Sequence, residues 1–204
     1  MLEKYLQDAL IIWATIDPIG TMALFTALTA HQTSAQRRRT AIKTVLYAGT
    51  VLLGSIVVGQ IILTAMGIRL VSFQLSGGII LFLFGLQMIF GSGNQTSTTE
   101  PEHDIAVFPL AIPATATPGA ILAVILMTDN HVHPVSVQVG TALITVGILT
   151  ITLLLLLLST RIIKILGVNG ASILTRVMGI IVAALSVEFV MNALGVGQWI
   201  GPAP

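Results

Sequence analysis

Two carboxylates stand inside long apolar stretches, where an ionised group is costly. Asp17 opens the run Asp17-Pro18-Ile19-Gly20-Thr21, and Glu188 is followed one helical turn later by Asn192. A charge surrounded by apolar chain calls for a ligand, a proton or a polar partner. Burial lets a carboxylate load and release a proton near neutral pH. The sequence therefore predicts proton or cation binding at Asp17 and Glu188, and a structural hydrogen bond between Glu188 and Gln87 is the alternative.

Two proline-glycine interruptions could form a binding site from backbone groups. The first surrounds Pro18 and Gly20, and the second is Ile112-Pro113-Ala114-Thr115-Ala116-Thr117-Pro118-Gly119-Ala120. Proline frees the carbonyl one turn before it, and the half-helix that follows begins with unpaired amides at a positive dipole end. Such an end suits a carboxylate or another anion. A kink that serves only helix packing is the alternative interpretation.

Motifs for enzyme chemistry are missing from the sequence. It has no phosphate-binding glycine loop, nucleophile elbow or His-Glu-x-x-His motif, so we expect no enzyme, no cofactor and no pump driven by ATP within this chain. There is no cysteine, and the spacing of Asp129, His131 and His133 is too loose to predict a metal site. A formal net charge of +1 gives no reason to expect a nucleic-acid partner.

The composition is that of a membrane protein. Of the 204 residues, 55% are hydrophobic and 8% charged, with a mean hydropathy of +0.99, whereas a soluble domain carries about 25% charged residues. A bilayer core needs roughly 20 apolar residues per helix, so we expect an all-α membrane protein of about six transmembrane helices. The expected spans are residues 9–30, 41–66, 70–90, 105–127, 135–159 and 173–194. The residues before the first span lack a basic cluster with a cleavage site, so we expect that span to be retained.

Basic residues predict the orientation, because they favour the cytoplasmic side. Arg37–Arg39 follow the first span, and Arg161 and Lys164 follow the fifth. We therefore expect both termini outside and the Ser/Thr/Gly-rich linker 92–104 inside. Arg176, near the cytoplasmic start of the sixth span, is interpreted as an interfacial residue that extends toward water.

The two halves of the chain resemble each other. Gly78-Ile79-Ile80 matches Gly179-Ile180-Ile181, and in the same alignment Gln87 corresponds to Glu188. The proline-glycine breaks also correspond. Because a unit of three spans enters the membrane the opposite way round in its second copy, this pattern predicts inverted repeats, which are typical of transporters. A shared apolar composition is the alternative explanation. The expected organisation is one transmembrane domain, 1–204, with repeats 1–91 and 105–204 and the cytoplasmic linker 92–104.

Three segments carry a family resemblance. They are Asp17-Pro18-Ile19-Gly20 with Phe25, then Ser76-Gly77-Gly78-Ile79-Ile80-Leu81-Phe82, and finally Asp104-Ile105-Ala106-Val107-Phe108-Pro109-Leu110-Ala111-Ile112-Pro113 followed by Thr117-Pro118-Gly119-Ala120-Ile121. These resemble the first-, third- and fourth-span motifs of the MarC family, and the resemblance covers essentially the whole chain. Two positions depart from it. Thr21-Met22-Ala23 stands where the family often has a second proline, and Ala116-Thr117 stands where it usually has Ala-Gly.

The resemblance implies a bacterial or archaeal inner-membrane protein related to transporters of small neutral amino acids such as glycine and alanine. Together with the breaks, it leads us to expect a secondary transporter, coupled to protons or sodium ions, in which half-helix amides hold the substrate carboxylate. The expected substrate-binding residues are Asp17, Pro18, Gly20, Thr21, Pro113, Thr115, Thr117, Pro118, Gly119 and Ala120. The expected coupling-ion residues are Asp17, Glu188, Gln87 and Asn192.

Two alternatives stay open at the level of sequence. A lipid or lipid-phosphate translocase also uses inverted breaks, but it calls for basic residues at membrane depth, where Arg69 and Arg176 are the candidates. A membrane scaffold or stress-response protein would move nothing. Beyond a small-molecule substrate, a coupling ion and the lipid bilayer, the sequence leaves open a homo-oligomer as a further partner.

Overall fold

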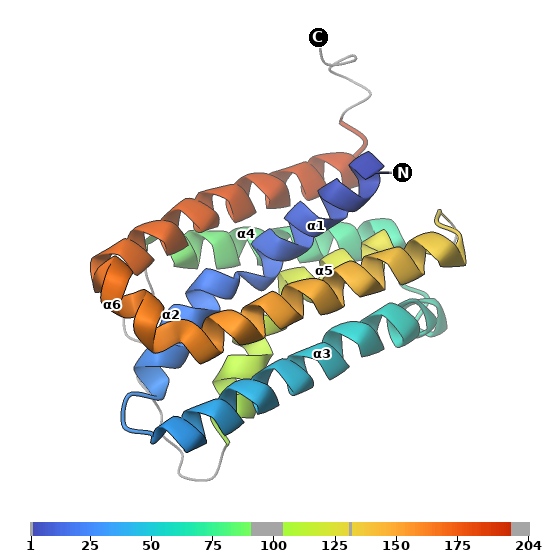
Figure 1. Cartoon of the computed structure of the whole chain (residues 1–204). Helices are drawn as coiled ribbons and strands as arrows, with labels where there is room; N and C mark the ends of the chain where they lie inside the picture. The colour runs from blue at the N-terminus through green and yellow to red at the C-terminus, as the bar shows by residue number, and fades with distance from the viewer. Residues whose placement is uncertain (1, 91–103, 131, 197–204) are drawn as a thin grey trace.

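The secondary structure is helical throughout the part of the chain that the computed structural model describes, residues 2–90, 104–130 and 132–196 (Figure 1). The elements in chain order are α1 (Leu2–Ile16), α2 (Pro18–Leu28), α3 (Ser34–Ala65), α4 (Leu70–Phe90), η1 (Ala106–Thr115), α5 (Pro118–Met127) and α6 (Val135–Ala193). The element η1 is an irregular helix of the wide π type, interrupted by extended backbone at Phe108 and Ile112. The predicted all-α class is confirmed over these residues.

The predicted spans largely agree with the helices. Five segments are long and apolar enough to cross a membrane: Glu3–Leu28, Ser34–Ala65, Leu70–Phe90, Val135–Ile165 and Ser172–Ala193. The pair η1 and α5, which is bent by 55°, makes a sixth if it counts as one span. The predicted break in the fourth span therefore lies between two half-helices. The first span is broken as well, because Asp17 separates α1 from α2.

The first span begins earlier than the sequence predicted, because its polar residues are paired within the protein. The Lys4 ammonium lies 2.8 Å from the carboxylate of Asp8, one helical turn away. Asp8 is buried and also accepts a hydrogen bond of 2.7 Å from the Thr141 hydroxyl of α6. The predicted start at residue 9 reflected the charges at these positions, which the helix accommodates through the ion pair and the hydroxyl.

Two glycines reverse the chain at opposite ends of the molecule. Gly67, with φ of 67°, follows α3, and Gly167, with φ of 69°, divides α6 into two arms. Residues with a Cβ avoid positive φ, so glycine suits both positions. Figure 1 shows the second arm of α6 running back beside the first part of the bundle. The fifth and sixth predicted spans are therefore the two arms of α6.

The helices of the two halves are interleaved. In the described residues α1 packs on α5 and α6, α2 packs on η1 and α6, and α4 packs on α5 and α6. A buried core joins Ile12 and Ile16 of α1 to Leu52 of α3 and Val124 of α5. Gly85 of α4 and Gly179 of α6 let their helices approach closely, since a Cβ on Gly85 would lie 3.0 Å from the Gly179 carbonyl oxygen.

Candidate functional site

The first break is built around Asp17. Its backbone is left-handed, with φ of 47° and ψ of 69°, a conformation that aspartate tolerates better than most residues. Its carboxylate Oδ1 accepts a hydrogen bond of 3.0 Å from the amide of Gly20 and so caps α2, which begins at Pro18. A Cβ on Gly20 would collide with this carboxylate. The sequence Asp-Pro-x-Gly therefore has a local reason at each of its defined positions.

The second break has the same construction with a neutral cap. The Thr117 hydroxyl accepts a hydrogen bond of 2.9 Å from the amide of Ala120, and α5 begins at Pro118. The same hydroxyl donates to the carbonyl of Thr15, at 2.7 Å, across the two breaks. In the other direction the Thr21 hydroxyl donates to the carbonyl of Ala114, at 3.0 Å. Two hydroxyls thus satisfy carbonyls that the breaks leave free and join the broken spans to each other.

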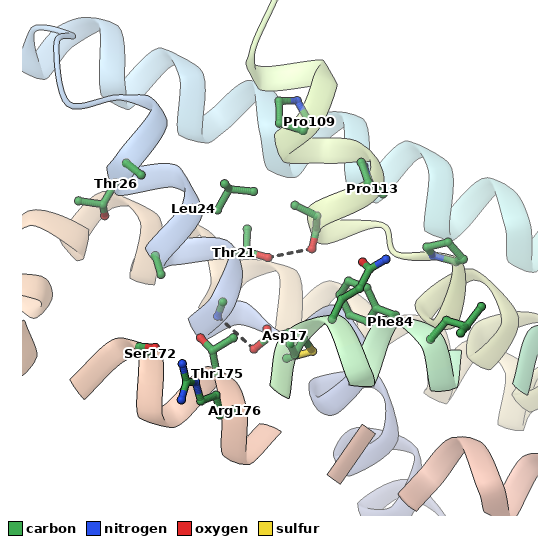
Figure 2. Close-up of a pocket in the computed structure, with 18 of the residues that line it drawn as sticks. Asp17, Thr21, Leu24, Thr26, Phe84, Pro109, Pro113, Ser172, Thr175 and Arg176 are labelled. Carbon is green, nitrogen blue, oxygen red and sulfur yellow. Dashed lines mark hydrogen bonds between the residues drawn. The ribbon is translucent and has the colours of Figure 1, made fainter. Parts of the chain in front are cut away.

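A cavity of about 780 Å³ adjoins the first break. Figure 2 shows residues around it, and the full lining comes from Asp17 at the first break and from α2, α4, η1, α5 and α6. Its lining is mostly apolar and comprises Asp17, Gly20, Thr21, Ala23, Leu24, Thr26, Ala27, Ile80, Leu83, Phe84, Gln87, Met88, Pro109, Pro113, Ala114, Pro118, Ile163, Ser172, Thr175 and Arg176. The Asp17 residue is only 4% exposed, so its carboxylate lies at the base of this space.

The cavity contains one acidic and one basic side chain among its described lining residues, Asp17 and Arg176. They come from opposite halves of the chain, and Figure 2 shows Arg176 beside Thr175 at the start of the second arm of α6. An apolar space that offers a carboxylate and a guanidinium suits a zwitterion, whose cationic group would approach Asp17 and whose anionic group would approach Arg176.

The structure brings only part of the predicted substrate site to the cavity. Asp17, Gly20, Thr21, Pro113 and Pro118 line it. The other predicted residues, Pro18, Thr115, Thr117, Gly119 and Ala120, are buried in the packing behind the breaks.

The predicted anion site at the half-helix ends is occupied by the protein itself. Asp17 takes the amide of Gly20 at α2, and Thr117 takes the amide of Ala120 at α5. In this conformation these two amides are already paired, and binding of a substrate carboxylate at the half-helix ends stays a prediction. A carboxylate already at the positive end of α2 also repels a second anion. The chemistry near the break therefore favours a cation or a proton at Asp17.

The predicted coupling residues do not form one cluster. Gln87 lines the cavity with Asp17. Glu188 and Asn192 are exposed on α6 and are not among the cavity residues. Asn192 Nδ2 donates a hydrogen bond of 3.1 Å to Glu188 Oε1. A role of these residues in ion coupling stays a prediction.

The sequence did not predict that Arg176 lines the cavity. It also did not predict that Leu24, Leu83 and Phe84 form an apolar wall there. A lone arginine at the start of a span suggested an interfacial position, because nothing in the sequence tells which way that face of α6 points. The apolar side chains looked like any others in a lipid-facing helix. Only the arrangement of α2 and α4 around an open space distinguishes them.

A second, smaller cavity of about 420 Å³ lies at the turn between α3 and α4 and includes Asp129. Gln60 of α3 closes one side of it through three hydrogen bonds. Its Nε2 donates to Asp129 Oδ1 at 3.1 Å and to the Thr128 carbonyl at 3.3 Å, and its Oε1 accepts from the amide of Asn130 at 3.1 Å. Within the described residues no three His, Cys, Asp or Glu side chains gather as a metal site, and His131 lies outside those residues.

Comparison with known proteins places the chain in one protein family. A family model described as "MarC family integral membrane protein" matches residues 2–197. A "UPF0056 membrane protein" of Buchnera aphidicola subsp. Schizaphis graminum (strain Sg) is 30% identical over 198 residues, which cover 97% of this chain and 98% of that protein.

Similar proteins also occur in a free-living bacterium and in an archaeon. The UPF0056 membrane protein YhcE of Escherichia coli (strain K12) is 28% identical, and the match covers 90% of this chain and 88% of YhcE. The UPF0056 membrane protein MJ1677 of Methanocaldococcus jannaschii is 32% identical, with coverage of 90% and 92%. No solved structure matches the chain.

Proposed function

The chain is a multi-pass integral membrane protein of the MarC family, and from this premise we propose that it is a secondary transporter of neutral amino acids, among them the small ones, glycine and alanine, that the sequence led us to expect. The observation that carries the proposal is the cavity beside the broken spans, where Asp17 and Arg176 offer opposite charges in mostly apolar surroundings. A neutral amino acid carries both complementary charges and no net charge, so it matches this pair better than a simple anion or cation does.

The position of Asp17 supports a coupling role. It lies roughly midway along the first span, Glu3–Leu28, and is almost fully buried. A carboxylate at that depth is costly while ionised, so a proton, a sodium ion or the substrate ammonium stabilises it. Binding of a proton or a sodium ion at Asp17, beside the substrate, couples its movement to that of the substrate. Glu188, which is exposed and lies outside the cavity, has less support for this role.

Two inverted repeats, 1–91 and 105–204 with the linker 92–104, form part of the proposal. Pro18 and Pro118 begin corresponding half-helices, one hundred positions apart, each after a residue whose side chain caps the helix. Gly67 and Gly167, also one hundred positions apart, make corresponding turns with positive φ. Correspondence of caps, breaks and turns is more than a shared apolar composition produces.

The moving parts of such a transporter are mixtures of both halves. Apart from α5 with α6, every closely packed helix pair in the described residues joins the first half to the second. Neither repeat therefore forms a separately packed body that could rotate against the other. We infer that the broken spans, tied together by the Thr21 and Thr117 hydroxyls, move as one unit against α3, α4 and α6.

The proposed location is the inner (plasma) membrane with both termini outside. The described beginning of α1 and the end of α6 lie at the same end of the bundle (Figure 1), as an even number of spans requires. Arg37–Arg39, in the first turns of α3, lie at the other end (Figure 1), and Lys164 directly follows the cavity residue Ile163 in the sequence. By the preference of basic residues for the cytoplasm, the cavity is nearer to the inside.

A second candidate function is a lipid or lipid-phosphate translocase. Arg176 supplies the basic residue that this function needs, and the apolar walls would suit acyl chains. The buried carboxylate of Asp17 argues against it, because a carboxylate repels a phosphate. This candidate ranks second for that reason. A scaffold that moves nothing would leave the charged cavity without a use.

The test is uptake of labelled glycine and alanine into proteoliposomes under inward proton or sodium gradients. We expect the parent protein to accumulate substrate and Asp17→Asn to lose gradient-driven accumulation. Arg176→Gln should lower uptake roughly tenfold or more, since a hydrogen bond to a charged group is worth about 1.5–3 kcal/mol. Arg161→Gln, on an exposed arginine of the same helix outside the cavity, is the matched control and should transport normally.

Glu188→Gln completes the experiment, because it tests the other predicted coupling carboxylate. Loss of coupling in Glu188→Gln but not in Asp17→Asn would transfer that role to Glu188. If folded parent protein accumulates no glycine, alanine or other neutral amino acid under either gradient, the transport proposal is wrong, and fluorescent-lipid scrambling becomes the next assay.

A further inference from the structure

The cavity is much larger than the smallest neutral amino acids. Its volume of about 780 Å³ lies within the range of roughly 300–1,000 Å³ found for sites that enclose drug-sized ligands. Glycine or alanine would occupy a small part of it. Apolar wall that the substrate does not cover contributes nothing to binding, because the hydrophobic gain follows the area removed from water.

Apolar side chains line the space between two helices that make little direct contact. Leu24 and Ala27 come from α2, and Ile80, Leu83 and Phe84 come from α4. The helix α4 packs mainly on α6 and α5, and α2 packs mainly on α6 and η1. The gap between α2 and α4 therefore has apolar walls, and α2 and α4 do not close it by extensive packing on each other.

The cavity residues of the second arm of α6 and Phe84 of α4 lie on opposite sides of Asp17. In Figure 2, Ser172, Thr175 and Arg176 lie on one side of Asp17, and Phe84 lies on the other side. A substrate whose charged groups engage Asp17 and Arg176 would direct its remaining atoms along the apolar walls. Ile80 and Leu83, which line the cavity, are 47% and 54% exposed, so other side chains of the described residues do not cover them fully.

We propose, resting on the amino-acid transport argued above, that this cavity selects neutral α-amino acids with large apolar side chains, such as leucine and phenylalanine, over glycine and alanine. The side chain occupies the space between α2 and the second half of α4. One additional methylene in an apolar pocket is worth roughly 10-fold or more in selectivity, so leucine should bind at least about tenfold more tightly than alanine.

The experiment is equilibrium binding of labelled leucine to the purified full chain in detergent, with competition by phenylalanine, alanine and glycine. Leu83→Trp adds a bulky ring to the apolar wall, and Leu154→Trp makes the same change at a residue of similar exposure, 52%, outside the cavity. We expect Leu83→Trp to weaken leucine binding about tenfold and to change alanine binding little. Leu154→Trp should bind as the parent does.

The outcomes separate this inference from the proposed function. If the parent binds glycine and alanine as tightly as leucine, the apolar selectivity is overturned and the transport proposal stands. The selectivity is likewise overturned, and transport left standing, if Leu83→Trp weakens the binding of all amino acids equally while its melting temperature shows that it remains folded. Absence of binding by every amino acid, with folded parent protein, overturns both.

Discussion

Asp17 combines three properties in one residue: a left-handed backbone, a helix cap and a charge. Its carboxylate binds the Gly20 amide while its backbone ends α1, and the same carboxylate adjoins the cavity. A charged residue is not needed for the cap, since Thr117 caps α5 with a hydroxyl. The charge at Asp17 is therefore the part that structure alone does not require.

Substitutions at Asp17 should separate the structural role from the charge. Asparagine tolerates left-handed backbone and caps helices nearly as well as aspartate, whereas alanine does neither. We expect Asp17→Ala to lose about 2 kcal/mol more unfolding free energy than Asp17→Asn, summing the left-handed and cap penalties. Denaturant titration in detergent micelles, followed by tryptophan fluorescence, measures this difference. Equal stability of the two variants would contradict the capping role.

A surface ion pair makes a small part of the stability dependent on pH. The Lys43 ammonium of α3 donates to Asp104 just before η1 and holds the pKa of that carboxyl below its usual value. A lowered pKa means that the pair stabilises the fold at neutral pH and is lost in acid, as the pH falls below about 4. Both side chains are about a third or more exposed, so the gain is under about 1 kcal/mol.

Asp104→Asn should therefore reduce the unfolding free energy by under about 1 kcal/mol at pH 7 and by a smaller amount at a pH low enough to protonate this carboxyl in the folded parent, where parent and variant are both neutral at this position. Lys43→Gln should behave alike. A penalty that is the same at both pH values would point to lost packing or backbone contacts in place of the ion pair.

At the scale of elements, the contact of α4 with the second arm of α6 depends on glycine. A Cβ on Gly85 would lie 2.9 Å from the Ala183 amide nitrogen and 3.0 Å from the Gly179 carbonyl oxygen, and backbone atoms move aside with difficulty. Gly85→Ala should destabilise the protein by about 1–3 kcal/mol. Gly147→Ala, where a Cβ meets nothing within 4 Å, should be neutral or stabilising because alanine favours helix. A thermal melt of each variant in the same detergent tests this difference in sign.

Gln60 holds α3 to the turn that follows α5 and so restricts the smaller cavity. Gln60→Leu removes all three hydrogen bonds at similar volume. We expect a cysteine introduced by Thr64→Cys, at a residue that lines this cavity, to react several-fold faster with a membrane-impermeant maleimide in that background. The chain has no cysteine of its own. Gln74→Leu, which removes a bond to the Phe189 carbonyl elsewhere, is the control; equal rates in both backgrounds would contradict the restriction.

The helices and their interruptions could be predicted from the sequence, and the surroundings of the site could not. Apolar length located the five spanning segments and the bent pair of η1 and α5, and Pro18 and Pro118 located both breaks, because proline and hydrophobicity act locally. The Thr117 hydroxyl bond to Thr15 joins residues 102 positions apart, and the place of Arg176 depends on the rotation of one arm of α6. Both the hydrogen bond and the position of Arg176 depend on how the helices pack, which a single sequence does not reveal.

At the scale of the whole molecule, the core is shared between the halves. Ile12 and Leu52 from the first half meet Val124 and Leu149 from the second in one buried cluster. The sequence predicts two copies of a three-span unit, which describes the order of the spans along the chain. A repeat does not specify whether the helices of each copy pack on one another or on the other copy, so the interleaved packing could not be predicted.

This interpenetration has a consequence for synthesis on the ribosome. Asp8 accepts a bond from Thr141, made 133 residues later, and the first span packs chiefly on η1, α5 and α6, which are translated last. The first span therefore enters the lipid first and without the helices that later cover it. The insertion machinery must shelter its two buried carboxylates, Asp8 and Asp17, until the second half of the chain arrives, and a nascent chain released early would present them to the cell's quality control as an unfinished protein.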